Sequence, residues 1–238
     1  MSLFYKLGSY YLFISKVFSE PDKHRIFVKQ VLREIQKYGI NSMSIISIIS
    51  VFFGAIIALQ TAYGLNNPLL PRYLIGLGTR DSMLLEFSST IICLILAGKV
   101  GSNIASEIGS MRSTEQIDAL EIMGVNSINF LVLPKIVAMM LFIPILNLLS
   151  VFLGISGGWL FGWISSVITT SEFIYGIQYQ FHPYYFVYTL IKAEVFAFIL
   201  TSVSAFYGYN TAGGAIEVGL SSTKAVVHSS VLILMFDV

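Results

Sequence analysis

The chain has 238 residues, of which 55% are hydrophobic and only 11% are charged. Soluble domains carry roughly 25% charged residues, so this composition excludes a soluble globular protein and predicts an all-α integral membrane protein. The formal net charge of +1 says little about partners, and the single cysteine, Cys93, excludes a disulfide framework.

Residues 1–40 are predicted to form two amphipathic helices that lie in the membrane interface. The second helix opens at Pro21 and turns an apolar face inward that includes Val31, Leu32 and Tyr38. Basic residues gather here: Lys6, Lys16, Lys23, Arg25, Lys29, Arg33 and Lys37. Basic amphipathic helices bind membrane interfaces, and this charge places the N-terminus in the cytoplasm. A basic arm that binds calmodulin-type partners or nucleic acid is the alternative, and we expect no nucleic-acid partner.

Residues 41–238 are predicted to be a transmembrane domain with five spans. The first span, Met43 to Tyr63, is an uncharged run long enough to cross the ~30 Å hydrocarbon core. The second runs from about Met83 to Ala105. Two later spans are expected at 128–150 and 184–207, and a fifth helix begins near Thr223.

Residues 128–168 form one apolar run that is long enough for one very long helix or for two spans. If both halves crossed the membrane, the loop at 169–183 would be cytoplasmic, yet it contains no Lys or Arg. The positive-inside tendency therefore favours a single helix. Pro134 and Pro144 predict bends in it rather than breaks, because packed neighbours can satisfy the freed backbone groups.

The fifth helix is predicted to be short. A Gly-rich loop, 208–219, precedes it, and the apolar run from Ala225 onward covers only about 21 Å at 1.5 Å per residue. This length falls short of a full span.

Residues 97–125 interrupt the apolar pattern and contain a predicted cytoplasmic helix at about 113–124. Gly109 marks the end of the incoming helix, Ser113 acts as N-cap with Gln116 three residues later, and Gly124 follows the last turn. Helical spacing puts Ile117, Leu120 and Met123 on a packed face and Glu115, Asp118 and Glu121 on the opposite face. Two interpretations stay open: a solvated loop helix on the membrane surface, or a docking helix whose acidic face meets a basic partner.

Ionisable residues inside the predicted spans are the other functional clue, because each costs about 2.5 to 3.5 kcal/mol at mid-bilayer. Lys99 lies near the cytoplasmic end of its span and can extend its ammonium to the interface. Lys192 lies deep in the fourth span, and we expect it to face the bundle interior and meet an acidic group or a lipid phosphate. The alternatives are that Lys192 satisfies helix carbonyls at a packed interface, or that Lys192 and Glu194 form an ion or proton relay.

We find no enzyme chemistry in the sequence. The dipeptide Gly98-Lys99 lacks the rest of a Walker A loop, so ATP hydrolysis is expected in a separate chain and no cofactor in this one. His24, His182 and His228 are scattered and predict no metal site.

Four stretches of the sequence resemble the MlaE/YrbE family, the permease subunits of lipid-transporting ABC systems. The first is EIGSMRSTEQIDALEIMGV at 107–125, preceded by AGKVGS, and the second is YGYNTAGGAIEVGLSSTKAVVHSSVLILMFD at 207–237. GAIIALQ at 54–60 and LIKAEVF around Lys192 also fit.

The resemblance implies a homodimeric permease of the bacterial inner membrane that moves phospholipid. A cytoplasmic ABC ATPase would dock on the coupling helix, at Arg112, Glu115, Gln116, Asp118 and Glu121, and a periplasmic MCE-type lipid-binding protein would lie above. The lipid cavity would include Gln60, Tyr63, Glu86 and Lys192. The alternatives are an ion- or proton-coupled secondary transporter and a membrane scaffold without transport activity.

Overall fold

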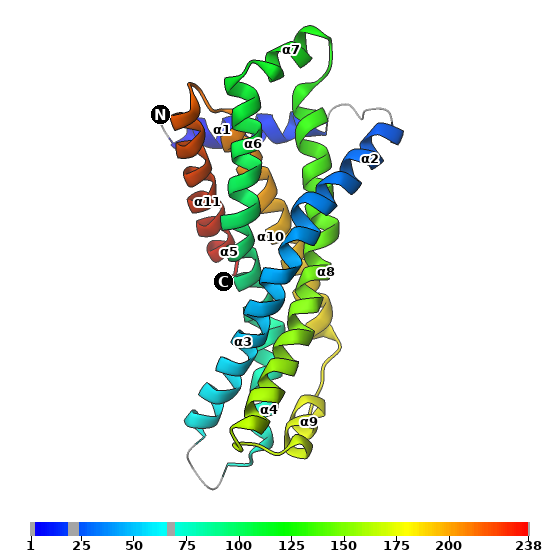
Figure 1. Cartoon of the computed structure of the whole chain (residues 1–238), viewed down its shortest axis with the longest axis vertical. Helices are drawn as coiled ribbons and strands as arrows, with labels where there is room; N and C mark the ends of the chain where they lie inside the picture. Colours follow the sequence, from blue (N-terminus) through cyan, green and yellow to red (C-terminus); the bar gives the residue numbers. More distant parts are fainter. Residues whose placement is uncertain (1–2, 19–23, 66–69, 238) are drawn as a thin grey trace. The chain divides into compact units, whose positions relative to one another are not determined.

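The computed structural model describes residues 3–18, 24–65 and 70–237, and all regular secondary structure in these ranges is helical (Figure 1). In chain order the helices, with η for π-helical turns, are α1 (Leu3–Val17), α2 (His24–Glu34), η1 (Ile35–Ile40), α3 (Asn41–Gly64), α4 (Tyr73–Ser82), η2 (Met83–Phe87), α5 (Ser88–Leu96), η3 (Ala97–Gly101), α6 (Ser102–Ser113), α7 (Gln116–Ile122), α8 (Ser127–Ile164), α9 (Thr170–Gln178), α10 (Tyr184–Tyr209) and α11 (Ala215–Asp237).

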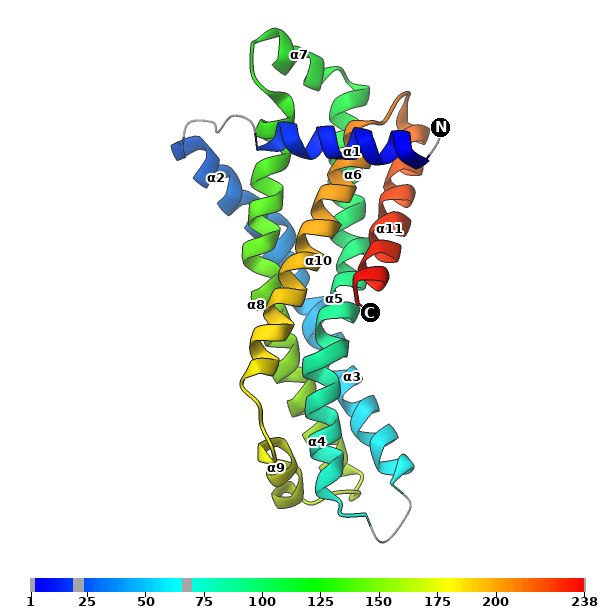
Figure 2. The same cartoon turned by 180° about the vertical axis from the view of Figure 1, so that it is seen from behind.

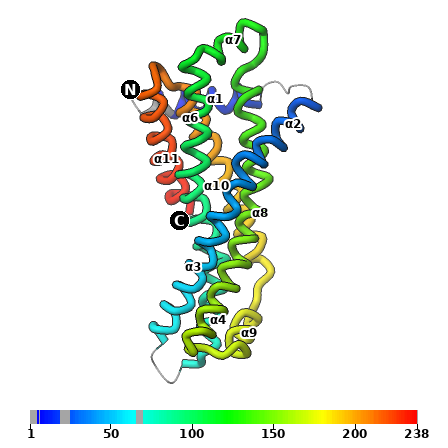
Figure 3. The backbone as a smooth tube through the Cα atoms, viewed as in Figure 1, coloured from blue at the N-terminus to red at the C-terminus, as the bar shows by residue number. Residues whose placement is uncertain are grey.

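Five helical stretches among the described residues are long and apolar enough to cross a membrane, as the sequence predicted. They are Arg25–Gly64, Tyr73–Ser113, Ser127–Ile164, Tyr184–Tyr209 and Ala215–Asp237. The backbone passes from α2 through η1 into α3 without a break (Figure 3). The second basic helix and the first span are therefore one continuous helical stretch, in which Val31 and Tyr38 are buried. Leu32, expected on the packed face, is 61% exposed.

The second span is longer than predicted at both ends. Helices α4, η2, α5, η3 and α6 follow one another directly, so the helical path covers 73–113 instead of 83–105. Gly109, predicted as a helix end, is buried inside α6, where Thr211 Oγ1 would lie 3.0 Å from an added Cβ. Gly109 therefore allows the chain near Thr211 to pack closely against α6, and it does not end a helix.

Two further expectations concern the C-terminal half. Helix α8 is a single helix of 38 residues that contains Pro134 and Pro144, as predicted. Helix α11 was predicted too short: it has 23 residues, which corresponds to about 35 Å. It begins at Ala215 because Glu217 Oε2 accepts a hydrogen bond from the Gly214 backbone N–H and so caps the first turn.

Helix α9 lies in a segment, 169–183, that the sequence predicted to be a loop. Its N-terminus is a capping box: the Thr169 hydroxyl accepts a hydrogen bond from the Glu172 N–H, while Glu172 Oε2 accepts one from the Thr169 N–H. The hydrogen bonds from Thr169 hold the pKa of Glu172 below its ordinary value.

Contacts divide the chain into two compact units. Unit 1 comprises Met1–Asn41, Cys93–Phe142 and Val195–Val238. In it, α1 lies across the end of α10 (Figure 2), with the Tyr10 and Phe13 rings 5.5 and 5.6 Å from the Phe206 ring. Helix α11 runs beside α6, and Ser222 Oγ donates to the Ser102 carbonyl at 3.1 Å.

Unit 2 comprises Ser42–Ile92 and Ile143–Glu194. Its α3 and α8 segments touch backbone to backbone, since a Cβ built on Gly54 would lie only 1.7 Å from the Gly154 carbonyl oxygen. Close to this crossing, Ser50 Oγ donates to Ser150 Oγ at 2.8 Å, both side chains being buried. Small residues that let helices approach and hydroxyls that bond across them are the usual means of packing helices in a membrane.

Arg80 fastens α9 to α4 within unit 2. Its guanidinium donates to the carbonyls of Ile177 and Tyr179 at 2.6 and 2.8 Å and pairs with Asp81 at 2.8 Å, and its side chain is only 2% exposed. Arg80 was not among the residues predicted from the sequence to have a role. A buried arginine is retained only where such partners compensate its desolvation, so this residue organises the α4–α9 pair.

Candidate functional site

The first candidate site is the short connection between α6 and α8, which contains α7. Helix α6 continues through Ser113, and the chain then turns at Glu115, which has the left-handed φ of 60°. Helix α7 therefore starts at Gln116, with Glu115 rather than Ser113 as its N-cap residue and without a side-chain cap. Gly124, with φ of 78°, follows its end as predicted. The predicted start was wrong because α6 uses Ser113 for its own last turn.

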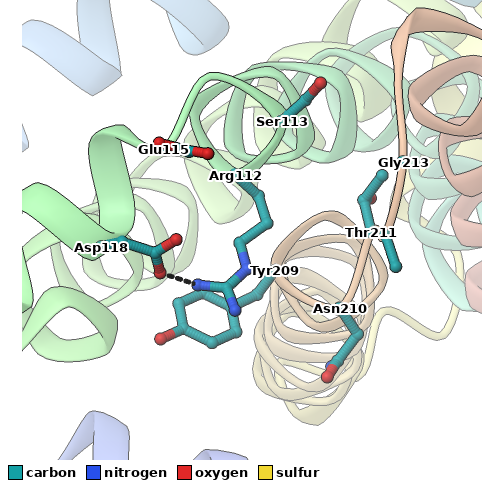
Figure 4. A pocket seen from close by; sticks show the side chains of 9 residues that line it. Arg112, Ser113, Glu115, Asp118, Tyr209, Asn210, Thr211 and Gly213 are labelled. Carbon is teal, nitrogen blue, oxygen red and sulfur yellow. Dashed lines mark hydrogen bonds and ion pairs between the residues drawn. The ribbon is translucent and has the colours of Figure 1, made fainter.

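Arg112 holds the beginning of α7 to the end of α6. Its Nη1 lies 2.5 Å from Asp118 Oδ1, and its guanidinium lies over the Tyr209 ring at 5.8 Å (Figure 4). These groups border a polar pocket of about 410 Å³. The pocket is lined by Arg112, Ser113, Glu115, Asp118, Tyr209, Asn210, Thr211, Ala212 and Gly213. The α6–α8 connection and the α10–α11 linker thus form one surface.

Glu121 fastens the other end of α7. Its Oε1 accepts hydrogen bonds from Ser127 Oγ and Tyr209 Oη, both at 2.8 Å. The hydrogen bond from Ser127 is the largest cause that lowers the pKa of Glu121 below its ordinary value, and the bond from Tyr209 is the next largest. Two of the three predicted acidic docking residues, Asp118 and Glu121, therefore have partners within the chain.

The outward side of α7 is partly apolar. Ile117 is buried, as predicted, but Met123, expected beside it on the packed face, is 68% exposed, and Ile122 is 87% exposed. The helix ends before Met123, so the helical spacing that predicted its position does not extend that far. Glu115 and Gln116 are also exposed, and Gln116 Nε2 donates to Thr114 Oγ1. The surface that α7 offers is thus a mixed one, with Glu115, Gln116, Ile122 and Met123.

The second candidate site is an ion pair in unit 2. Lys192 Nζ on α10 lies 3.2 Å from Glu86 Oε2 on η2 and donates to the Leu85 carbonyl at 3.1 Å. The Lys192 side chain is 6% exposed and that of Glu86 is 56% exposed. The structure therefore brings together two of the four residues predicted for the lipid cavity. Glu86 is thus an acidic group that Lys192 meets, as the sequence predicted.

Gln60 and Tyr63 lie farther along α3. Phe53 of α3 lies beside Phe87, with the centroids of the two rings 6.4 Å apart. Farther along α3, Thr61 lies beside Gly78. Gln60 and Tyr63 are exposed, and at 1.5 Å per residue they are displaced from the level of Phe53 by about 10 and 15 Å. The structure does not bring them to the Lys192–Glu86 pair.

Lys99, expected near the end of its span with its ammonium at the interface, lies in η3, inside the continuous helical path of 73–113. Its Nζ donates to the Asn41 carbonyl at 2.5 Å. Glu107 and Lys135, which were not predicted as site residues, form an ion pair of 2.9 Å in unit 1. Lys135 carried the same signal in the sequence as Lys192, an ionisable residue inside an apolar helix.

The five apolar helical stretches of span length among the described residues indicate a multi-pass membrane protein. The family model described as Permease MlaE matches residues 31–238. The chain belongs to the MlaE permease family of ABC transporters.

Individual relatives agree with this assignment. A probable ABC transporter permease protein of Rickettsia felis is 31% identical over 96% of this chain and 88% of its own length. One from Synechocystis sp. is 33% identical over 98% of this chain and 88% of its own length. The intermembrane phospholipid transport system permease protein MlaE of Haemophilus influenzae is 28% identical over 87% of this chain and 79% of its own length.

Proposed function

We propose that this chain is the permease subunit of an ABC transporter that moves phospholipid between the bacterial inner membrane and a periplasmic lipid-binding partner of the MCE type. A separate cytoplasmic ATPase drives transport, and two copies of this chain form the permease. The N-terminus lies in the cytoplasm, and the basic helices of residues 1–40 lie in the membrane interface. Family membership supports this proposal, as does the name of the Haemophilus influenzae relative.

Helix α7 is the element on which the ATPase docks. It is tied at its start by Arg112–Asp118 and at its end by Glu121 with Ser127 and Tyr209. An isolated helix of this length would be marginal in water, so these ties give it a fixed position. The exposed side chains Glu115, Ile122 and Met123 then offer a rigid surface, with an apolar tip of the kind that fills pockets at protein interfaces.

The observation that carries the lipid part of the proposal is the Lys192–Glu86 pair. A buried ammonium beside an exposed carboxylate can exchange that carboxylate for the phosphate of a lipid, because both are oxyanions that accept charge-assisted hydrogen bonds. The surrounding spans are apolar and suit acyl chains. An amphiphile therefore fits this site better than a hydrophilic solute.

Copurified phospholipid tests this site. We expect Lys192→Met to reduce the phospholipid phosphate retained per purified chain at least fivefold, because the cation that binds the phosphate is lost. Lys192→Arg keeps the cation and should retain lipid. Glu86→Gln removes the competing carboxylate and should retain as much lipid as wild type or more. Equal phosphate content in Lys192→Met and wild type would exclude Lys192 from lipid binding.

A further inference from the structure

A partly buried group of charged side chains joins three segments of unit 1. Lys135 Nζ on α8 lies 2.9 Å from Glu107 Oε2 on α6 and 3.0 Å from Glu34 Oε2 on α2. Glu107 Oε1 lies 2.8 Å from Lys37 Nζ on η1, and the Tyr38 hydroxyl donates to Glu107 Oε2. We call these five residues the charge clasp.

Lys135 is the centre of the charge clasp. Its side chain is 4% exposed, whereas that of Lys37 is 46% exposed. The contact with Glu107 is a hydrogen-bonded ion pair, while the contact with Glu34 is an ion pair without hydrogen-bond alignment. Two ammonium groups balance two carboxylates, so the set is neutral as a whole. Removing Lys135 would take an ammonium partner from both Glu34 and Glu107, and breaking such a pair is costly where the charges are poorly solvated.

The position of the charge clasp relates it to α7. Glu107 precedes the end of α6 by about 9 Å along the helix axis, and Lys135 follows the start of α8 by about 12 Å, at 1.5 Å per residue. The Lys135–Glu107 pair therefore joins α6 directly to α8, the two helices on either side of α7. The same pair is bonded to Glu34, Lys37 and Tyr38, which belong to the N-terminal segment.

Two further contacts join α8 to residues that precede α3. Asn129 Nδ2 on α8, with a buried side chain, donates to the Val17 carbonyl of α1 at 2.6 Å. The Cβ of an alanine at Gly39 would lie 2.4 Å from the Phe142 ring, so η1 lies directly on α8. The charge clasp is thus the polar part of an extended contact between residues 24–40, here called the N-terminal arm, and the helices that flank α7.

We propose that Lys135 is a positioning residue that holds the N-terminal arm, α6 and α8 together, so that these helices and α7 move as one body. Sliding of α8 against α6 or against the N-terminal arm would separate the buried Lys135 ammonium from a carboxylate, and this cost opposes it. Only one consequence rests on the proposed function: if the ATPase displaces α7, the displacement is passed to the N-terminal arm.

Amide hydrogen exchange of the full-length purified protein tests the charge clasp without the ATPase. We expect Lys135→Met to speed exchange in residues 30–40 at least tenfold, while α11 exchanges within twofold of wild type. The matched control is Lys224→Met, which removes an exposed lysine of unit 1 and should leave residues 30–40 unchanged. A general loss of stability would instead raise exchange in α11 as much as in the N-terminal arm, and that result would overturn the proposal.

A second variant covers the case in which Lys135→Met fails to fold. The triple variant Lys135→Met, Glu107→Gln, Glu34→Gln removes the unpaired carboxylates together with the lysine. We expect it to fold and still to exchange at least tenfold faster in residues 30–40. Wild-type exchange in this variant would refute the charge clasp. If the wild-type protein bound no ATPase, the proposed function would fail, but the exchange comparison would still decide the role of Lys135.

Discussion

Replacing Arg80 by Met should destabilise the protein by about 3 to 5 kcal/mol, the cost of breaking a buried ionic network. The variant leaves Asp81 and the carbonyls of Ile177 and Tyr179 without the guanidinium that binds them. The substitution Arg80→Lys would restore these bonds only in part, because an ammonium lacks the planar fork that reaches several acceptors at once. The free energy of unfolding in detergent measures the effect.

Arg72 provides the matched control for Arg80. It lies at the start of the same helix, α4, but its side chain is exposed. Arg72→Met should change the unfolding free energy by less than about 0.5 kcal/mol, as surface substitutions usually do. If Arg80→Met and Arg72→Met unfolded alike, Arg80 would have no part in holding α9 to α4.

Gly54→Ala should cost about 3 kcal/mol, at the upper end of the range for overpacking a well-packed interior. The added Cβ would lie 1.7 Å from the Gly154 carbonyl oxygen, and backbone cannot rotate away as a side chain can. Helices α3 and α8 would have to separate, which would also stretch the Ser50–Ser150 hydrogen bond. The same unfolding measurement in detergent gives the size of the effect.

Gly64→Ala tests whether the position or the glycine matters. Gly64 is the last residue of the same helix, and an added Cβ there would meet no atom within 4 Å. Its replacement should leave stability within about 1 kcal/mol of wild type, since helical Gly costs roughly that much relative to Ala. Equal effects of the two substitutions would show that the α3–α8 crossing tolerates a side chain.

Hydrophobic pattern and charge predicted much of the fold. Span length and the lack of basic residues at 169–183 predicted five apolar helices and a single α8. The start of α11 was predicted too late because the Gly-rich stretch at 208–219 predicts a loop. The helix begins within that stretch, where Glu217 accepts a hydrogen bond from the Gly214 N–H. The capping box of α9 is a local signal that the sequence contains, and it could have been recognised.

The candidate sites were predictable only as residue types. An ionisable residue in an apolar helix indicates a buried partner, so the sequence marked Lys192 as a residue of interest. Helical periodicity does not tell which residue of another helix lies opposite, and the partner Glu86 is more than a hundred positions away. For the same reason the Lys135–Glu107 pair and the carbonyl partners of Arg80 emerged only in three dimensions.

Copurification with the ABC ATPase tests directly whether the ATPase binds α7. The double variant Ile122→Asp, Met123→Asp changes two exposed side chains at the end of α7 and should leave the fold intact. Ile174→Asp, which alters an exposed residue of α9 in unit 2, is its control. We expect the α7 variant to lose at least nine-tenths of the bound ATPase while it keeps its phospholipid, and the control to keep both. Full ATPase binding by the α7 variant would contradict the assignment of α7 as the docking element.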